Sequence, residues 1–433
     1  MNLRELELRF FRNYEEQRFS FAPGVNLIVG SNAQGKTNLL EAISFLGSGK
    51  SFRAQKTGEM VGFSRDFAEI TGKCDSQGRE QTVRWVLYPN GRPRQLWRNG
   101  VRKKSAGDLA GVLPTVLFCP EDLMILKSGA SQRRRFGDTV LCALRPNYEA
   151  ALAEYNRILE QKSRILKDGH EDIRLLSLLP DYDQRLCQVG ALLISYRARF
   201  YQSLGQEAAR FHSRFSGGAE EFRLEYKTVS TVKDPFAPVA QLREDLRAHL
   251  EAHGRAELQS CSCLTGPHKD DFTITLSGVD LKSYGSQGQT RTAAISLKLA
   301  QRELMKREFG EEPLLLLDDV LSELDEKRQD FVLNQISSGQ VFITCCEPGR
   351  FTKLGKTMEI SGGALQNPLL PGEGGGIINP LLGEGGTPKA RRVWGGTQNR
   401  PGTAPLPPPG RHLPPGEGKE TPAAGAAPSP RGR

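Results

Sequence analysis

Apolar and polar residues alternate along the first twenty residues of the chain, as they do on strands with one buried face. The segment 3–21 reads LRELELRF and then, after a short turn, QRFSF. A short apolar run follows at 25–30, and apolar residues then recur at helical spacing through 37–47. The segment 63–100 alternates again and is broken by turn signals such as PNGRP. The pattern predicts paired strands, a buried strand that enters a helix, and a second group of strands.

Between about residues 146 and 215 the apolar period becomes that of a helix. One set of apolar residues at this spacing runs from Tyr148 to Ile165, and a second runs from Tyr182 to Phe200. A break at about 168–180 separates the two sets. Each stretch of about 20 residues predicts a helix of roughly 30 Å, and the apolar stripes predict that the two helices pack together as a second lobe.

From residue 261 the chain returns to alternating strands and helices. A strand ending at about 276 precedes a glycine-containing turn, a helix over 290–309 and the apolar strand PLLLLDD at 313–319. A further helix and the strand QVFITCC follow. A continuous apolar strand is typical of a parallel sheet covered on both faces. The two ends of the chain's body are therefore expected to form one α/β domain with the helical lobe inserted between them.

This organisation divides the chain into four parts. Residues 1–110 and 261–360 are the two halves of the α/β head, 111–260 are the inserted, largely helical lobe, and 361–433 are a tail. The tail holds 17 Gly and 14 Pro in 73 residues and has no strand or helix periodicity. Such a composition cannot bury enough apolar surface to offset chain entropy, so a disordered, Pro/Gly-rich tail is predicted.

Charge and cysteine content narrow the class of protein. The net charge is +9, but residues 1–360 hold 51 basic and 46 acidic residues, or +5. A body this close to neutrality needs a local basic patch to bind nucleic acid. There are eight cysteines, no secretory signal and no apolar run of about 18 residues. We therefore expect a reduced, cytoplasmic protein that does not span a membrane.

Residues 30–37 read GSNAQGKT, the phosphate-binding loop pattern, between the predicted strand and helix. Glycines let backbone N–H groups turn toward phosphate oxygens, and the helix N-terminus adds partial positive charge. Lys36 is expected to reach the β- and γ-phosphates, and the Thr37 hydroxyl to ligate Mg²⁺. The residues predicted to bind ATP in this loop are Gly30, Ser31, Asn32, Ala33, Gln34, Gly35, Lys36, Thr37 and Asn38.

Two carboxylates end the apolar strand at 313–319. Parallel strands present their carboxyl ends to a bound nucleotide. Asp318 is therefore predicted to hold Mg²⁺ with Thr37, and Asp319 to orient or deprotonate the attacking water.

A third motif, SYGSQGQT at 283–290, opens the long helix with a polar turn whose N–H groups suit an anion. The order of phosphate loop, insertion, polar turn and carboxylate strand resembles the ABC-type ATPase head, a P-loop NTPase. That resemblance implies two subunits that share each nucleotide. Ser286, Gly288 and Gln289 would then contact ATP held by the partner. SELD at 322–325 stands where such heads place a loop that crosses the dimer interface.

Six motifs in this order and spacing resemble the RecF family of bacterial DNA replication and repair proteins over essentially residues 1–360. They are FRNY at 11–14, GSNAQGKTNLLEAI at 30–43, FCPEDLMILKSGASQRRRF at 118–136, GPHKDDF at 266–272, SYGSQGQTRT at 283–292 and LLLLDDVLSELDEKR at 314–328.

The resemblance implies an ATP- and Mg²⁺-dependent dimer that binds single- and double-stranded DNA in the repair of single-strand gaps. RecF proteins are weak, DNA-stimulated ATPases that work with the mediators RecR and RecO and assist the loading of RecA. In related heads the turn holding Arg12 and Asn13 approaches the nucleotide. The family usually has Arg where this chain has Lys269, which keeps the charge but loses the bidentate fork.

Three alternative classes of protein share parts of this pattern. Other SMC-like heads carry hundreds of residues of coiled coil at the insertion, whereas about 246 residues separate Thr37 from Tyr284. A transporter ATPase subunit would carry a much shorter insertion. A nucleotide-gated DNA scaffold with negligible turnover is not excluded by the sequence, because hydrolysis in such heads is slow.

Two basic runs are candidates for contact with DNA phosphates, RRR at 133–135 and RKK at 102–104. Each is alternatively an ordinary solvated surface. His268 is interpreted either as a ligand or as a hydrogen-bonded structural histidine.

Overall fold

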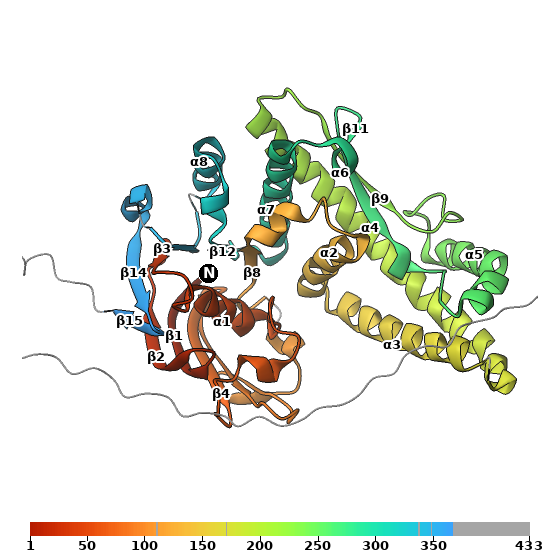
Figure 1. The fold of residues 1–433 in the computed structure, drawn as a ribbon, viewed down its shortest axis with the longest axis horizontal. Coiled ribbons are helices and arrows are strands. Elements are labelled where there is room, and N and C mark those ends of the chain that lie inside the picture. The colour runs from red at the N-terminus through yellow and green to blue at the C-terminus, as the bar shows by residue number, and fades with distance from the viewer. Residues whose placement is uncertain (110, 170, 337, 348, 367–433) are drawn as a thin grey trace, which may run out of the picture. The chain divides into compact units, whose positions relative to one another are not determined.

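The computed structural model describes residues 1–366, apart from residues 110, 170, 337 and 348. These residues form a head that contains two sheets and a lobe built mainly from helices (Figure 1). From residue 367 onward the predicted tail lies outside the described residues. Short 3-10 helices join the main elements: η1 (Thr57–Met60), η2 (Ala106–Leu109), η3 (Pro120–Met124), η4 (Ile173–Leu178), η5 (Pro267–Lys269), η6 (Val320–Glu323) and η7 (Gly349–Leu354).

A six-stranded sheet in the order β15-β14-β3-β13-β12-β8 organises the head. Its strands are parallel except for β15, which is antiparallel to β14. All residues of β12 and β13 are buried, as expected for parallel strands covered on both faces. The strands are β3 (Val25–Val29), β8 (Thr115–Phe118), β12 (Leu314–Asp318), β13 (Val341–Cys345), β14 (Lys356–Ser361) and β15 (Ala364–Gln366).

Successive residues of β12 enter two different hydrophobic cores. Leu314 and Leu316 pack in the core that contains α1 (Lys36–Ser48) and the antiparallel sheet. Leu315 and Leu317 pack in the core that contains α7 (Gln287–Phe309), α8 (Glu326–Gln335) and the lobe helices. Because side chains alternate across a strand, one apolar run serves both faces of the sheet. The lobe is thereby packed directly on the head.

The antiparallel sheet has the order β2-β1-β4-β5-β6-β7 and covers the outer side of α1. Trp85 of β5 illustrates this packing, because its ring lies 5.3 Å from that of Phe45 and its indole N–H donates to the carbonyl of Leu46 at 3.2 Å. The strands are β1 (Asn2–Phe11), β2 (Tyr14–Ser20), β4 (Ala68–Ser76), β5 (Arg79–Leu87), β6 (Gln95–Arg98) and β7 (Val101–Lys103).

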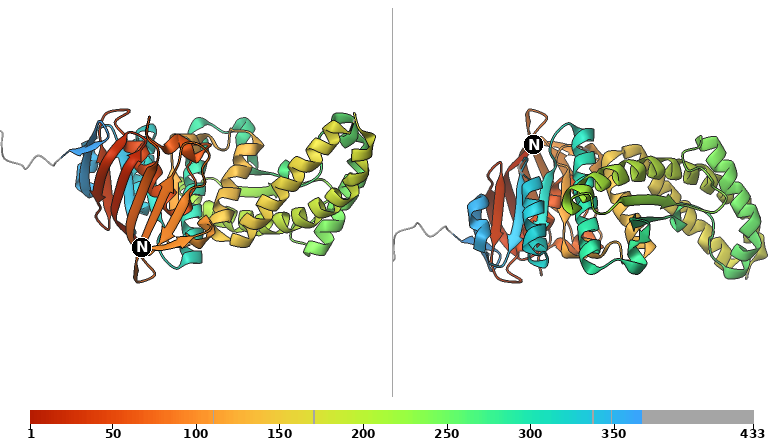
Figure 2. Two further views of the ribbon diagram at one scale, coloured as in Figure 1. Left: turned by 90° about the horizontal axis from the view of Figure 1, so that it is seen from below. Right: turned by 90° about the horizontal axis from the view of Figure 1, so that it is seen from above.

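The lobe contains four long helices and a small sheet in the order β11-β10-β9. In both views of Figure 2, the helices coloured yellow to green extend away from the two sheets of the head. No helix in the described residues is long and apolar enough to cross a membrane. The lobe elements are α2 (Ala130–Leu144), α3 (Pro146–Asp168), α4 (Leu179–Ser216), α5 (Val239–Ser260), α6 (Leu281–Tyr284), β9 (Phe222–Lys227), β10 (Asp271–Leu276) and β11 (Val279–Asp280).

The second helix of the lobe is longer than the apolar pattern predicted. Helix α4 has 38 residues rather than about 20, which corresponds to about 57 Å at 1.5 Å per residue. Beyond Phe200 its buried face continues with Leu204, Ala208 and Phe211. Polar residues alternate with apolar ones in this second half of α4, so the sequence shows no clear apolar stripe there. Helices and strands distant in the sequence, among them α7 and β9, pack against α4.

Strand pairing differs from the predicted boundaries at three places. Strand β8 falls within 111–260 but pairs with β12 of the head, and β10 falls within 261–360 but pairs with β9 of the lobe. Strand β15 falls within the predicted tail but pairs with β14. The hydrogen bonds that assign these strands to their sheets mostly join segments that are distant in the sequence, and a local pattern does not reveal such pairs. The division into four parts remains a prediction.

Candidate nucleotide-binding site

The phosphate loop joins β3 to α1, and its glycines are required by its packing. Gly35 has a φ of +118° and is the N-cap of α1. A Cβ at Gly35 would lie 2.8 to 3.0 Å from side-chain atoms of Asn13 and Tyr14. A Cβ at Gly30 would lie 2.3 Å from the carbonyl oxygen of Ile360. Glycine is needed at one position by the left-handed backbone and at the other by the close approach of β14.

The side chain of Lys36 folds back onto the loop. Its Nζ donates to the carbonyl oxygens of Gly30 at 2.5 Å and Ser31 at 3.2 Å, and it lies 3.3 Å from Cys346 Sγ. The residue is 6% exposed. The thiol of Cys346, just after β13, also donates to Asn32 Oδ1 at 3.0 Å. The loop thus holds a positive charge where helix-terminal N–H groups favour phosphate oxygens.

Thr37 and Asp318 meet at the carboxyl end of β12, as predicted for a metal site. The Thr37 hydroxyl donates to Asp318 Oδ1 at 3.0 Å, and the Thr344 hydroxyl donates to the same oxygen at 2.9 Å. Burial raises the pKa of Asp318, and the two hydroxyl groups oppose this shift. Adjacent hydroxyl and carboxylate oxygens are hard donors that suit Mg²⁺, which completes its shell with water and phosphate oxygens. The pair therefore fits the predicted ion.

Asp319 differs from its neighbour in conformation and surroundings. Its φ is +54°, its backbone N–H donates to the Thr344 hydroxyl at 2.8 Å, and its side chain is half-buried. Left-handed backbone is uncommon for a residue other than glycine. Asp319 lines a cavity of about 990 Å³ together with Thr37, Asp318 and, from α2, Arg135. Both carboxylates therefore border this cavity, and the Asp319 side chain is the more exposed of the two.

The predicted residues of the β1–β2 turn have two different positions. Asn13 donates to the carbonyl oxygen of Gln34 at 3.0 Å and accepts from Asn38 at 2.8 Å, so it supports the phosphate loop. Arg12 instead makes a two-pronged ion pair with Glu41 of α1, with both hydrogen bonds at 2.8 Å. Since Glu41 is fully buried, this pair anchors the turn to α1.

A turn that falls within the predicted tail also supports the phosphate loop. Gly362 and Gly363 join β14 to β15, and the Gly363 N–H donates to the carbonyl oxygen of Gln34 at 3.0 Å. A Cβ at Gly363 would lie 2.2 Å from the carbonyl oxygen of Asn13. The only signal in the sequence was a Gly-Gly pair directly after an apolar strand, which is typical of a hairpin turn.

The SQGQ turn forms the N-terminus of α7. The Ser286 hydroxyl accepts from the Gln289 N–H at 3.2 Å, and Gln289 Oε1 accepts from the Ser286 N–H at 3.0 Å, which is a capping box. The carbonyl of Gly288 accepts from Arg328 at 2.9 Å. In the part of the chain that the structure describes, no hydrogen bond or ion pair joins 286–289 to the phosphate loop. Ser286 is exposed.

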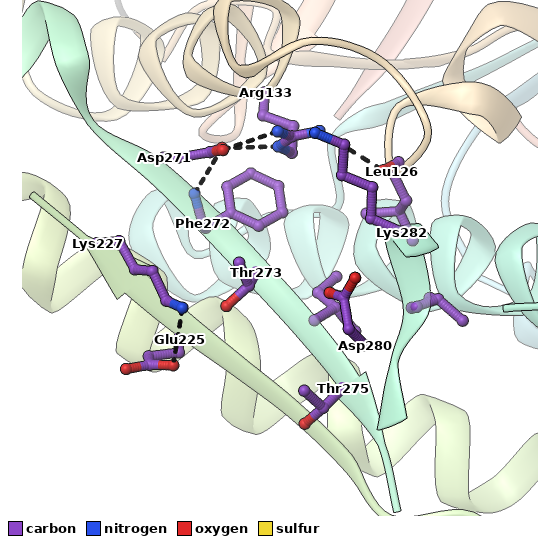
Figure 3. Close-up of a pocket in the computed structure, with 12 residues that line it drawn as sticks. Leu126, Arg133, Glu225, Lys227, Asp271, Phe272, Thr273, Thr275, Asp280 and Lys282 are labelled. Carbon is purple, nitrogen blue, oxygen red and sulfur yellow. Dashed lines mark hydrogen bonds and ion pairs between the residues drawn. The ribbon is translucent and has the colours of Figure 1, made fainter. Parts of the chain in front are cut away.

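The basic run at 133–135 is not a uniform DNA-binding surface. Figure 3 shows Arg133 beside a pocket of about 360 Å³, where it makes a two-pronged ion pair with Asp271 at 2.6 and 2.7 Å. The Arg133 side chain is 3% exposed. Arg134 donates to the carbonyl oxygen of Asp270 at 2.7 Å, whereas Arg135 is exposed. The prediction of DNA contact is therefore wrong for Arg133, because its charge is used to join α2 to β10.

The second basic run lies at the edge of the antiparallel sheet. Arg102 and Lys103 belong to β7, the outer strand, and Lys104 follows it. Arg102 and Lys104 are exposed, and the ion pairs among the described residues include none of the three. This run is therefore the better candidate for a DNA contact.

His268 is a structural histidine rather than a free ligand. Its Nδ1 is hydrogen-bonded to the Tyr155 hydroxyl at 2.7 Å and its Nε2 lies 3.1 Å from the carbonyl oxygen of Cys263. Burial lowers the pKa of His268 to about 4. The neighbouring Lys269 is exposed.

The fold and the site together define a P-loop ATPase head. The family described as "RecF/RecN/SMC N terminal domain" matches residues 2–364, so the chain is a member of this class of ATPase. A curated DNA replication and repair protein RecF of Acetivibrio thermocellus is 37% identical over 352 residues, covering 81% of this chain and 95% of the relative. The RecF of Agathobacter rectalis is 40% identical over 353 residues, covering 82% and 94%.

Solved structures agree with this assignment. The recombination mediator protein RecF of the RecFOR pathway, solved with ATPrS, is 35% identical, with a TM-score of 0.78 over 84% of this chain and 97% of that one. The same protein solved with ATP has a TM-score of 0.77 over 84% and 96%. The chain belongs to the RecF family of DNA replication and repair proteins.

Proposed function

We propose that this protein is an ATP-dependent clamp that closes on DNA during recombinational repair and replication restart. The observation that carries the proposal is the convergence of Lys36, Thr37 and Asp318 at one end of the parallel sheet, with the SQGQ turn presented to solvent elsewhere. One subunit would hold ATP on its phosphate loop, and the exposed turn of a second would close over it.

ATP is the expected ligand because two solved relatives that are 35% identical to this chain are RecF with ATPrS and RecF with ATP. Lys36 would exchange its two carbonyl acceptors for phosphate oxygens, which bind an ammonium more strongly. Thr37 and Asp318 would hold Mg²⁺, which neutralises charge on the phosphates. Asn13 and the Gly362–Gly363 turn would keep Gln34 and its loop in place.

Slow hydrolysis would open the clamp. Asp319 would orient or deprotonate the attacking water, since it borders the cavity beside Asp318. The rival, a scaffold that binds nucleotide without turnover, is tested by measuring phosphate release with and without gapped DNA. A DNA-stimulated rate that is lost in Asp319→Asn supports the clamp.

Membership of the RecF family supports DNA and the mediator proteins as binding partners. The relative named above is a recombination mediator of the RecFOR pathway, so we propose RecR and RecO as partners and assistance to RecA as the outcome. The exposed 102–104 run is the proposed contact with phosphates of single- or double-stranded DNA. The body charge of +5 implies that only a few such contacts are made.

The decisive experiment mixes two inactive variants. Lys36→Ala removes the charge that faces the phosphates, so ATP binding should be lost. Ser286→Arg should leave ATP binding intact and block closure by bulk. Each homodimer then has two defective composite sites, whereas a mixed dimer has one site with both lesions and one intact site.

Mixing should therefore recover ATP-dependent dimerisation, measured by sedimentation velocity, and part of the ATPase activity. If both sites must close together, dimers recover without turnover. If neither signal returns while both variants remain folded, the shared-site proposal is wrong.

A further inference from the structure

A chain of hydrogen bonds links the SQGQ turn to the inserted lobe through Glu220. The carboxylate of Glu220 accepts from Gln289 Nε2 at 2.7 Å through one oxygen, and its other oxygen lies 2.9 Å from Nε2 of His212. The same Gln289 uses its side-chain oxygen to cap the N–H of Ser286 at 3.0 Å. The order of contacts is therefore His212, Glu220, Gln289 and Ser286.

The His212 end of this series of hydrogen bonds is held by packing. His212 lies near the end of α4, is fully buried, and its ring lies 5.4 Å from that of Phe222 at the start of β9. Its Nδ1 has no hydrogen-bond partner in the described part of the chain, so Glu220 supplies the hydrogen bond that its ring makes. Helix α4 packs along α7 (Figure 1).

Glu220 itself follows a connection that contains two glycines. Gly217 caps α4 with a φ of +64°, and Gly218 has a φ of +81°. The Glu220 side chain is 29% exposed. The hydrogen bond from Gln289 holds the pKa of Glu220 below its usual value, and His212 acts in the same direction. Glu220 is therefore ionised at neutral pH, and its bond to Gln289 is charge-assisted.

We propose that Glu220 is a positioning residue for the SQGQ turn, and that it couples closure of the subunits on ATP to the position of the inserted lobe. The inference rests on the proposed function, because the turn is taken to act on the nucleotide of a second subunit. With Glu220 present, the Gln289 amide is held at both of its polar atoms. Without it, Gln289 is free to rotate and the cap on Ser286 is weakened.

The neighbouring Glu221 is a matched control. Residue 221 is exposed, and within the described residues its carboxylate pairs with Arg223, two residues further along the chain. Glu220→Ala should weaken ATP-driven dimerisation about 10-fold, as measured by sedimentation velocity, and leave ATP binding to the phosphate loop within about 2-fold. Glu221→Ala should match the wild type in both measurements. Glu220→Gln should restore dimerisation, because an amide oxygen accepts the same hydrogen bond.

A double-mutant cycle separates positioning from general stability. Gln289→Ala alone should weaken dimerisation, and adding Glu220→Ala should cause no further loss, because the pair acts through one contact. Additive losses, or a Glu220→Ala variant that dimerises like the wild type, would overturn the positioning role. Equal losses in Glu220→Ala and Glu221→Ala would also overturn it. If the wild-type protein fails to dimerise with ATP, the proposed function is wrong, and the proposed coupling of subunit closure to the inserted lobe is wrong as well.

Discussion

Asp318 and Asp319 are adjacent in sequence but are placed for different tasks. Asp318 is 6% exposed and receives hydrogen bonds from two threonine hydroxyls. Asp319 has left-handed backbone, is half-buried and borders the same large cavity as Asp318. A carboxylate held by two hydroxyl groups suits a fixed cation, and the more exposed carboxylate beside it suits a mobile water.

Substitution of each aspartate by asparagine should therefore separate two steps. Asp318→Asn should abolish both Mg²⁺-dependent dimerisation and hydrolysis, because a neutral amide is a poor Mg²⁺ ligand. Asp319→Asn should lower the hydrolysis rate by about 100-fold or more while ATP-bound dimers still form. Phosphate release and sedimentation with ATP measure the two steps. Identical behaviour of the two variants would contradict separate roles.

At the scale of elements, two turns from distant parts of the chain hold the phosphate loop. The β1–β2 turn contributes Asn13, and the β14–β15 turn contributes Gly363, and both donate to the carbonyl oxygen of Gln34. Because the loop itself has no regular secondary structure, these contacts fix its backbone from outside. The β14–β15 turn thus supports the phosphate loop, although its sequence falls within the predicted tail.

Gly363→Ala should therefore impair the site. Its φ is +76°, which alone costs alanine about 1 kcal/mol, and the new Cβ would lie 2.2 Å from the backbone of Asn13. We expect ATP affinity to fall about 5- to 10-fold, as measured with a fluorescent ATP analogue.

Gly78→Ala is the control, since Gly78 has a similar φ of +68° but a Cβ there would meet no atom within 4 Å. It should lower stability slightly and leave ATP affinity unchanged. Equal effects of the two substitutions on affinity would show that strain alone, and not contact with the loop, is responsible.

At the scale of the whole molecule, head and lobe share the hydrophobic core on one face of the parallel sheet. Buried ion pairs add specific links within the lobe: Arg133 joins α2 to Asp271, and Arg197 joins α4 to Asp138 and Asp270. The two arginine side chains used in this way are only 3% and 4% exposed. The proposed DNA contact is therefore assigned to exposed groups such as Arg102 and Lys104.

Neutralising residues 102–104 with glutamine should flatten the dependence of DNA affinity on salt. Removing one phosphate contact lowers the slope of log affinity against log salt by about 0.9 on duplex DNA. Fluorescence anisotropy over a salt series measures the slope. Arg164→Gln removes an exposed arginine of α3 that pairs with Glu160, and should leave the slope unchanged. An unchanged slope after the 102–104 substitution would place the DNA contact elsewhere.

Much of the fold and the centre of the site could be predicted from the sequence. Lys36, Thr37 and Asp318 belong to motifs whose strand and helix context lies within about fifteen residues of each. Local backbone preference and apolar periodicity are enough to define such elements. The same holds for the helical lobe, since the stripes that predicted α3 and about half of α4 are periodic within each helix.

Tertiary structure decided the features that depend on which distant segments meet. The partners of Arg12, Arg133 and Gly363 lie between 29 and more than 300 residues away in the sequence, so their contacts leave no local pattern. The same physical reason applies to Glu220, whose link to Gln289 joins residues 69 positions apart. By itself the sequence determined the elements and the chemistry of the phosphate loop. Only packing determined which charges are buried, which turns support the loop, and where the sheets end.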